Sequence, residues 1–154
     1  MGWLDAATFK TVVASTPLLS IDLLVENERG EYLLGLRKNR PAKGYWFVPG
    51  GRVQKNESLD DAFNRISTVE LNVRLERSMA SFLGVYEHFY NDSFSSSLTS
   101  THYIVLAYKI KLKSDLVRLD MFQHYDLCWS CVDSILTGDS HIYTKRYFEF
   151  DLCP

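Results

Sequence analysis

The chain has 154 residues, of which 46% are hydrophobic and 23% charged, with a formal net charge of -2 at pH 7. This length fits one domain over residues 1–154, and a net charge near zero gives no general attraction to nucleic acid or to an anionic membrane. No apolar run approaches the ~20 residues of a membrane span, and the N-terminus lacks the features of a signal peptide, so a cytoplasmic location is expected.

The first forty residues predict a helix followed by a β-hairpin. Asp5 can cap a short helix that ends before Pro17. Residues 18–26 alternate around an apolar stretch, residues 27–30 form a turn, and residues 31–37 return as the second strand. Asp22 interrupts the first strand, and alternation alone leaves open whether it faces solvent or a site.

A tight turn and a capped helix come next. Residues 45–48 favour a strand, and Pro49-Gly50-Gly51 must turn the chain sharply. Ser58 is a typical N-cap for a helix over residues 59–73. The 3.6-residue period predicts that its apolar side chains share one buried face, namely Leu59, Ala62, Phe63, Ile66, Val69 and Val73.

Glu70 falls within this apolar face. A carboxylate that leaves water without a partner is costly, so Glu70 needs an arginine, hydrogen-bond donors or a metal ion. The position of Glu70 on a helical wheel favours an ion pair over a metal ligand and leaves both open.

The second half of the chain predicts further strands and short helices. Residues 80–90 form an aromatic-rich strand, the serine-rich residues 91–100 a loop, and residues 101–112 another strand. Residues 124–132 are strand-like, and the two segments 133–136 and 142–150 favour helix. Strands and helices without regular βαβ alternation indicate an α+β fold.

The region around the capped helix resembles the Nudix box. Gly51, Glu57, Arg65 and Glu70 have the spacing of that motif, in which a loop, a helix and a loop hold magnesium against a nucleoside diphosphate derivative. The match departs from the pattern at four positions. Ile66 and Val69 stand where the family usually has glutamates, Ser67 stands at an apolar position, and Asn72 replaces the last glycine.

Longer stretches are similar to one Nudix subfamily, the GDP-mannose mannosyl hydrolases. These are residues 15–18, 39–55, 101–103 and 123–124. The resemblance implies a Nudix α/β/α sandwich around a mixed sheet, a homodimer and one Mg²⁺ per subunit. It also implies hydrolysis of GDP-mannose, or a related GDP-hexose, to GDP and free sugar by attack of water at the anomeric carbon with inversion.

The same resemblance implies roles for individual residues. Glu70, the Gln123 side chain and the Gly50 carbonyl would hold the metal. Arg37 and Arg52 would clamp the diphosphate, with a hydrogen bond from Tyr103.

Four further residues complete this predicted site. Asp22 would lie near the sugar, and His88 is a weaker candidate, either for a sugar or phosphate contact or for a structural hydrogen bond. Lys38 belongs to a basic cluster that is either a solvated strand end or a phosphate contact. His124 would be the general base, since an imidazole can accept a proton near neutral pH; in isolation a structural histidine is the commoner case.

Two other functions remain open. A Nudix pyrophosphohydrolase would attack phosphorus, but it normally needs the glutamates that Ile66 and Val69 replace. A non-catalytic nucleotide-sugar sensor is possible because Asn72 replaces the glycine of the box, although asparagine tolerates a left-handed helix end.

Overall fold

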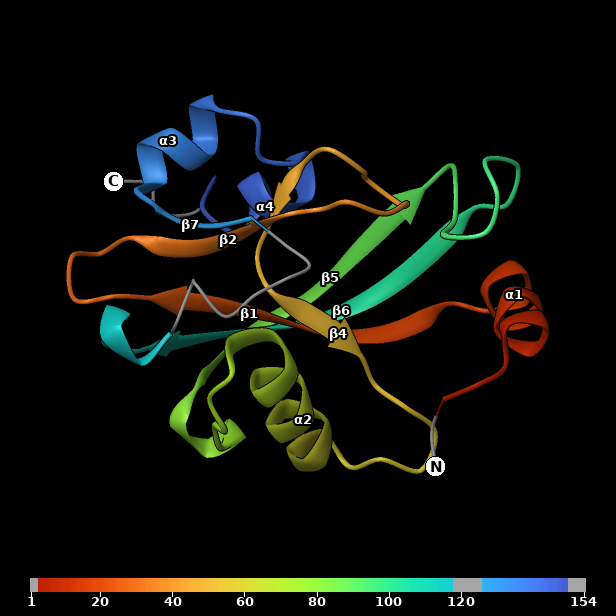
Figure 1. The fold of residues 1–154 in the computed structure, drawn as a ribbon, viewed down its shortest axis with the longest axis horizontal. Helices are drawn as coiled ribbons and strands as arrows, with labels where there is room; N and C mark the ends of the chain where they lie inside the picture. The colour runs from red at the N-terminus through yellow and green to blue at the C-terminus, as the bar shows by residue number, and fades with distance from the viewer. Residues whose placement is uncertain (1–2, 118–125, 150–154) are drawn as a thin grey trace.

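A mixed β-sheet forms the centre of the fold in the computed structural model, which describes residues 3–117 and 126–149 (Figure 1). Within these residues the strands are β1 (Leu18–Glu26), β2 (Tyr32–Leu36), β3 (Trp46–Phe47), β4 (Gly50–Arg52), β5 (Ser81–Tyr90), β6 (Thr101–Lys111) and β7 (Leu127–Ser130). Their order is β3-β2-β1-β6-β5, with β4 also paired to β1 and β7 to β2. The pairing of β1 with β6 is parallel, and the other strand pairs are antiparallel.

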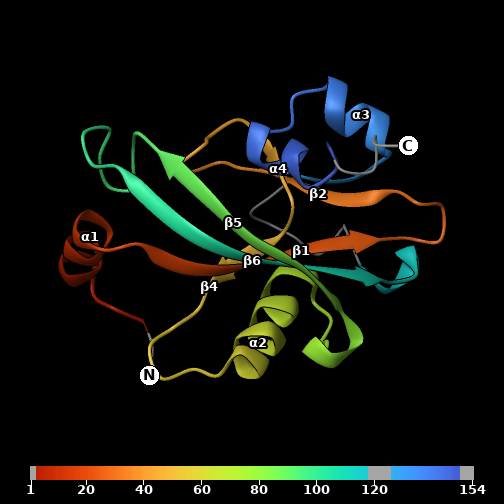
Figure 2. The same cartoon turned by 180° about the vertical axis from the view of Figure 1, so that it is seen from behind.

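Helices cover both faces of this sheet. They are α1 (Ala6–Ser15), α2 (Leu59–Leu71), α3 (Val132–Thr137) and α4 (Ile142–Arg146), with short 3₁₀ turns at Arg77–Met79 and Ser114–Leu116. Figures 1 and 2 show α2 on one face, α3 and α4 on the other, and α1 beyond the end of the sheet. None of the described helices is long and apolar enough to cross a membrane.

Alternation along β1 supplies two hydrophobic cores. Ile21, Leu23 and Val25 pack with Phe63 and Ile66 of α2. Leu24, on the opposite face, belongs to a second core with residues of β2, α3 and the segment after α4. Because Asp22 has the parity of Leu24, its side chain faces the layer of α3 and α4 rather than α2.

The predicted start of α2 is confirmed. The Ser58 hydroxyl accepts a hydrogen bond from the Asp61 backbone N–H at 3.1 Å, and Asp60 and Asp61 occupy the first turn, where carboxylates suit the helix dipole. At the other end Asn72 adopts φ 55°, the left-handed conformation that the glycine of the Nudix box would adopt easily.

The prediction that Val69 belongs to the buried face of α2 is wrong. Val69 is 64% exposed, whereas Ser67 and Leu71 are fully buried. The sheet covers the side of the helix centred between Phe63 and Ser67, and Val69 lies outside it. Ser67 tolerates burial because its hydroxyl donates to the Asn64 carbonyl and accepts from the Leu75 N–H.

The C-terminal helix is shorter than predicted. The helix expected over residues 142–150 ends at Arg146, and the chain then turns inward. Tyr147 and Phe148 are 6% and 1% exposed and belong to the second core. This inward turn brings Tyr147 into contact with Asp22 of β1.

Candidate active site

Most of the predicted site residues lie around one cavity, on the face of the sheet that carries Asp22. The predicted residues in its wall are Asp22, Arg37, Gly50, Arg52, His88 and Tyr103. The sheet explains this gathering: Gly50 and Asp22 are partners in the β4–β1 pairing, and His88 and Tyr103 are partners in the β5–β6 pairing. Partners in a sheet point their side chains to the same face.

Two arginines give the cavity its positive charge. The Arg37 guanidinium donates to the Pro41 carbonyl at 2.9 Å and lies 5.7 Å from the centre of the Phe47 ring. The Arg52 guanidinium lies 4.7 Å from the centre of the Phe9 ring of α1. Neither arginine has a salt bridge to a carboxylate within the described residues, so both charges are available to an anion.

The same wall holds a carboxylate, Asp22, and a neutral imidazole, His88. The Tyr147 hydroxyl donates to Asp22 Oδ2 at 2.6 Å and lies 3.3 Å from His88 Nε2. Burial raises the pKa of Asp22 to about 6, while the Tyr147 hydrogen bond and the Arg37 charge act to lower it. Burial also lowers the pKa of His88 to about 4, so the His88 ring is neutral at pH 7.

Glu70 lies in an adjoining cavity that also contains Arg37 and Gly50. Burial raises the pKa of its carboxyl to about 7, and the Arg37 charge acts in the opposite direction. No ion pair or hydrogen bond to the Glu70 side chain occurs within the described residues. The ion pair that the helical wheel favoured is therefore not found in this part of the chain.

The donors around Glu70 fit a magnesium ion that also binds phosphate. Within residues 3–117 and 126–149, no three His, Cys, Asp or Glu side chains are grouped for a metal. Glu70 shares a cavity with Gly50, and the Asp22 carboxylate, which is also beside Gly50, is bound to Tyr147. Mg²⁺ usually keeps several waters and uses one or two carboxylates together with phosphate oxygens. A partly buried carboxylate such as Glu70, which has no ion pair or hydrogen bond to any described side chain, matches that requirement.

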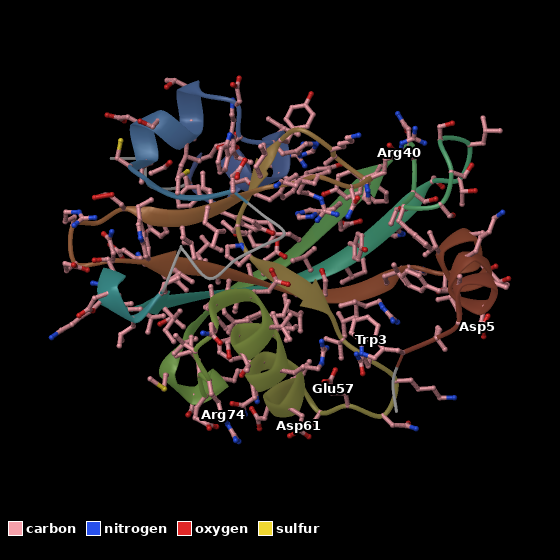
Figure 3. The ribbon with its side chains drawn as sticks, viewed as in Figure 1. Trp3, Asp5, Arg40, Glu57, Asp61 and Arg74 are labelled. Atoms are coloured by element: carbon pink, nitrogen blue, oxygen red, sulfur yellow. The ribbon has the colours of Figure 1, made fainter. Side chains whose placement is uncertain are left out.

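The first glutamate of the Nudix box has a different task. Glu57 accepts hydrogen bonds from Arg65 at 2.7 and 3.0 Å, and the Arg65 guanidinium also donates to the Arg52 carbonyl at 2.8 Å. The Arg65 hydrogen bonds hold the pKa of Glu57 below its usual range. Figure 3 shows Glu57 beside α2. The Glu57–Arg65 pair connects the loop after β4 to this helix, and the Arg65 bond to the Arg52 carbonyl holds the Arg52 backbone in position.

Lys38, a predicted phosphate contact, does not join these cavities. Lys38 is exposed and lines a separate hollow with Asn39, Arg40 and Lys43; Arg40 is labelled near the end of β5 in Figure 3. Gln123 and His124 lie outside the described residues.

Sequence reasoning missed Tyr147 and Tyr90. Tyr90 lines the cavity. Tyr147 lies outside the cavity wall and donates a hydrogen bond to Asp22. The contact between Tyr147 and Asp22 spans 125 residues of sequence, so no local motif could have revealed it.

Comparisons with known proteins agree with this architecture. Residues 16–149 match the model of the NUDIX domain. The chain is 44% identical over 141 residues to the low-salt glycan biosynthesis protein Agl8 of Haloferax volcanii, covering 92% of this chain and 86% of that protein.

Two solved structures have a similar fold. A MutT NUDIX hydrolase from Burkholderia pseudomallei is 26% identical, with a TM-score of 0.69 over 88% of this chain and 98% of the other. A MutT protein from Methanosarcina mazei Go1 is 24% identical, with a TM-score of 0.69 over 88% and 94%. With the domain match over most of its length and the mixed sheet between helical layers, the chain belongs to the Nudix family of hydrolases.

Proposed function

We propose that this protein hydrolyses GDP-mannose, or a closely related GDP-hexose, to GDP and free hexose by attack of water at the anomeric carbon. The observation that carries the proposal is the set of charged and polar groups that share one cavity wall. Arg37 and Arg52 are cationic and have no salt bridge within the described residues, whereas Asp22 is a carboxylate and His88 a neutral ring. A nucleoside diphosphate sugar has a matching anionic end and a hydroxyl-rich end.

The loss of the usual glutamates favours attack at carbon over attack at phosphorus. Ile66 is buried and Val69 is exposed on α2, and Glu57 is already bound to Arg65. The described part of the site therefore lacks the several free carboxylates that would hold metals and activate water next to phosphorus. Departure of a diphosphate from carbon requires mainly that its growing negative charge be stabilised.

Arg37 and Arg52 supply this stabilisation in the proposed reaction. Their guanidinium groups can donate paired hydrogen bonds to phosphate oxygens, and the Tyr103 hydroxyl can add another. Glu70 and the Gly50 carbonyl, with Gln123, are the proposed ligands of a Mg²⁺ ion. Bound Mg²⁺ would neutralise part of the diphosphate charge and so improve the leaving group.

The remaining task is to remove a proton from the attacking water. His124 is the proposed base, because it adjoins Gln123 in the subfamily pattern and an imidazole can accept a proton near pH 7. A single displacement by water, without a protein nucleophile, inverts the anomeric centre. Asp22 and His88 would hold the sugar while this happens.

The relative from Haloferax volcanii supports a sugar substrate, since its name places it in glycan biosynthesis. A homodimer also belongs to the proposal through the subfamily resemblance, and sedimentation of the purified protein would test it.

Product analysis tests the proposal. The purified protein is incubated with GDP-mannose and Mg²⁺, and the nucleotides are separated by ion exchange. GDP with free mannose is the expected result. GMP with mannose 1-phosphate would instead identify a pyrophosphohydrolase, and tight binding without any product would identify a sensor.

A further inference from the structure

A tyrosine lies directly behind the part of the cavity wall that carries Asp22 and His88. Tyr147 is 6% exposed, and the cavity wall does not include it. Tyr147 directly follows α4. A second tyrosine, Tyr143 within α4, stacks on His88, with ring centres 4.4 Å apart and an angle of 6° between the planes. The Tyr143 hydroxyl also bonds the backbone N–H and carbonyl of Phe89, each at 2.9 Å. Tyr143 and Tyr147 therefore hold the His88 ring in place.

The number of protons determines the direction of each hydrogen bond. The Tyr147 hydroxyl has one proton, and an ionised Asp22 can only accept. The 2.6 Å contact with Asp22 Oδ2 is the shorter one, so this bond takes the tyrosine proton.

The Tyr147 oxygen then offers only lone pairs to His88 Nε2, 3.3 Å away. A hydrogen bond there requires the proton of the neutral ring to be on Nε2. Nδ1 is left as an acceptor, and the Tyr90 hydroxyl, 3.5 Å away, can donate to it. The donors thus run in one direction, from Tyr90 through His88 and Tyr147 to Asp22.

We propose that Tyr147 is a positioning residue that makes this end of the cavity a subsite of acceptors for sugar hydroxyl groups. It occupies Asp22 Oδ2, while Oδ1 has no hydrogen-bond partner within the described residues. It also fixes His88 with Nδ1 unprotonated. The acceptors left to a ligand are Asp22 Oδ1 and the Tyr90 oxygen, since the Tyr90 proton is donated to His88 Nδ1. Acceptors without a positive charge suit hydroxyl donors and repel a phosphate, so the substrate would bind with its hexose here and its diphosphate at Arg37 and Arg52.

The assignment of this end to the hexose rests on the function proposed above, whereas the hydrogen-bond order does not. Nuclear magnetic resonance of ¹⁵N-histidine-labelled protein, at about pH 8, reports the protonated nitrogen of each neutral ring. The His88 signal is identified through its absence in His88→Gln. We expect the Nε2–H tautomer in the native protein and a mixture of tautomers in Tyr147→Phe. An Nδ1–H tautomer in the native protein would overturn the proposal, and that measurement needs neither activity nor the Tyr147 variant to fold.

Kinetics of Tyr147→Phe test the assignment to the hexose. Tyr108→Phe is the matched control, because it removes the hydroxyl of another buried tyrosine, which packs in the core beneath α2 and lies 3.5 Å from Arg77. We expect kcat/KM for GDP-mannose to fall roughly 10- to 100-fold in Tyr147→Phe, the usual range for losing a hydrogen bond to a buried charged group. Inhibition by GDP, which has no hexose, should not change.

An equal loss of GDP binding, or an equal effect of Tyr108→Phe, would show a general structural role and overturn the proposal. Native protein that does not act on GDP-mannose at all would instead contradict the proposed function, with the tautomer still deciding the hydrogen-bond order.

Discussion

Replacing Gly50 with alanine tests how closely β4 must approach β1 at the site. A Cβ atom at Gly50 would lie 2.4 Å from Asp22 Oδ1 and 2.6 Å from the Ile21 carbonyl oxygen, whereas real Cβ contacts are essentially never shorter than 3.0 Å. The strands would have to separate by at least 3.0 - 2.4 = 0.6 Å at the carboxylate and 3.0 - 2.6 = 0.4 Å at the carbonyl. Asp22 cannot simply rotate away, because its other oxygen is bound to Tyr147.

This displacement should reduce both stability and activity. Overpacking typically costs about 1–3 kcal/mol, which for a chain of this length lowers the Tm by roughly 3–10 °C. The Gly50 carbonyl, Asp22 and Arg52 would move relative to one another, and misplacement on the order of 1 Å can reduce turnover about 100-fold. We therefore expect kcat/KM to fall by roughly 10- to 100-fold.

Thermal unfolding and steady-state kinetics on GDP-mannose measure the two effects. Gly51→Ala is the matched control, since its Cβ would point at the Ile66 side chain of α2, 3.0 Å away, and needs little movement. Native Tm and native kinetics in Gly50→Ala would show that β4 and β1 need not approach each other so closely at Gly50.

Four further predictions concern other parts of the site. His124→Gln should lower kcat by roughly 10²–10⁴-fold with little change in metal affinity, and an equal loss of affinity would contradict its role as base. Glu70→Gln should instead weaken Mg²⁺ activation first, seen as a higher Mg²⁺ concentration for half-maximal rate. Arg65→Met should destabilise the protein by about 1–3 kcal/mol in urea unfolding, because it leaves Glu57 without its charged partner. Since unfolded His88 binds a proton below pH 6.5 and folded His88 only near pH 4, its contribution to stability should fall by about 2 kcal/mol from pH 8 to pH 5.

The last prediction requires a difference measurement. The raised pKa values of Asp22 and Glu70 change stability in the opposite direction, because these folded carboxyls keep protons that the unfolded chain releases as pH rises. The free energy of unfolding of native protein is therefore compared with that of His88→Gln at each pH. A constant difference between pH 8 and pH 5 would contradict burial of a neutral His88.

Local patterns predicted the elements whose physical causes are local. The start of α2 follows from Ser58 and two aspartates, and the hairpin before it from a polar turn between apolar runs. Val69 was placed wrongly because a helical period gives a stripe but not its centre, which the sheet sets by packing on Phe63 and Ser67.

The candidate site was predictable only in part. A carboxylate on the apolar side of α2 indicated that Glu70 needs a partner, and the structure leaves it beside Gly50 and Arg37. Asp22 was undecided from alternation alone, because the residue that decides it, Tyr147, is 125 positions away. Such a contact depends on how α4 returns to the sheet, which no short segment encodes.

Hydrolysis of GDP-mannose in ¹⁸O-water, with Mg²⁺ and early sampling, distinguishes attack of water at the anomeric carbon from attack at phosphorus. Mass spectrometry should find the label in mannose and none in GDP, since water would attack the anomeric carbon and leave both phosphates intact. Label in a phosphate group, with GMP and mannose 1-phosphate as products, would contradict the account and place the attack at phosphorus.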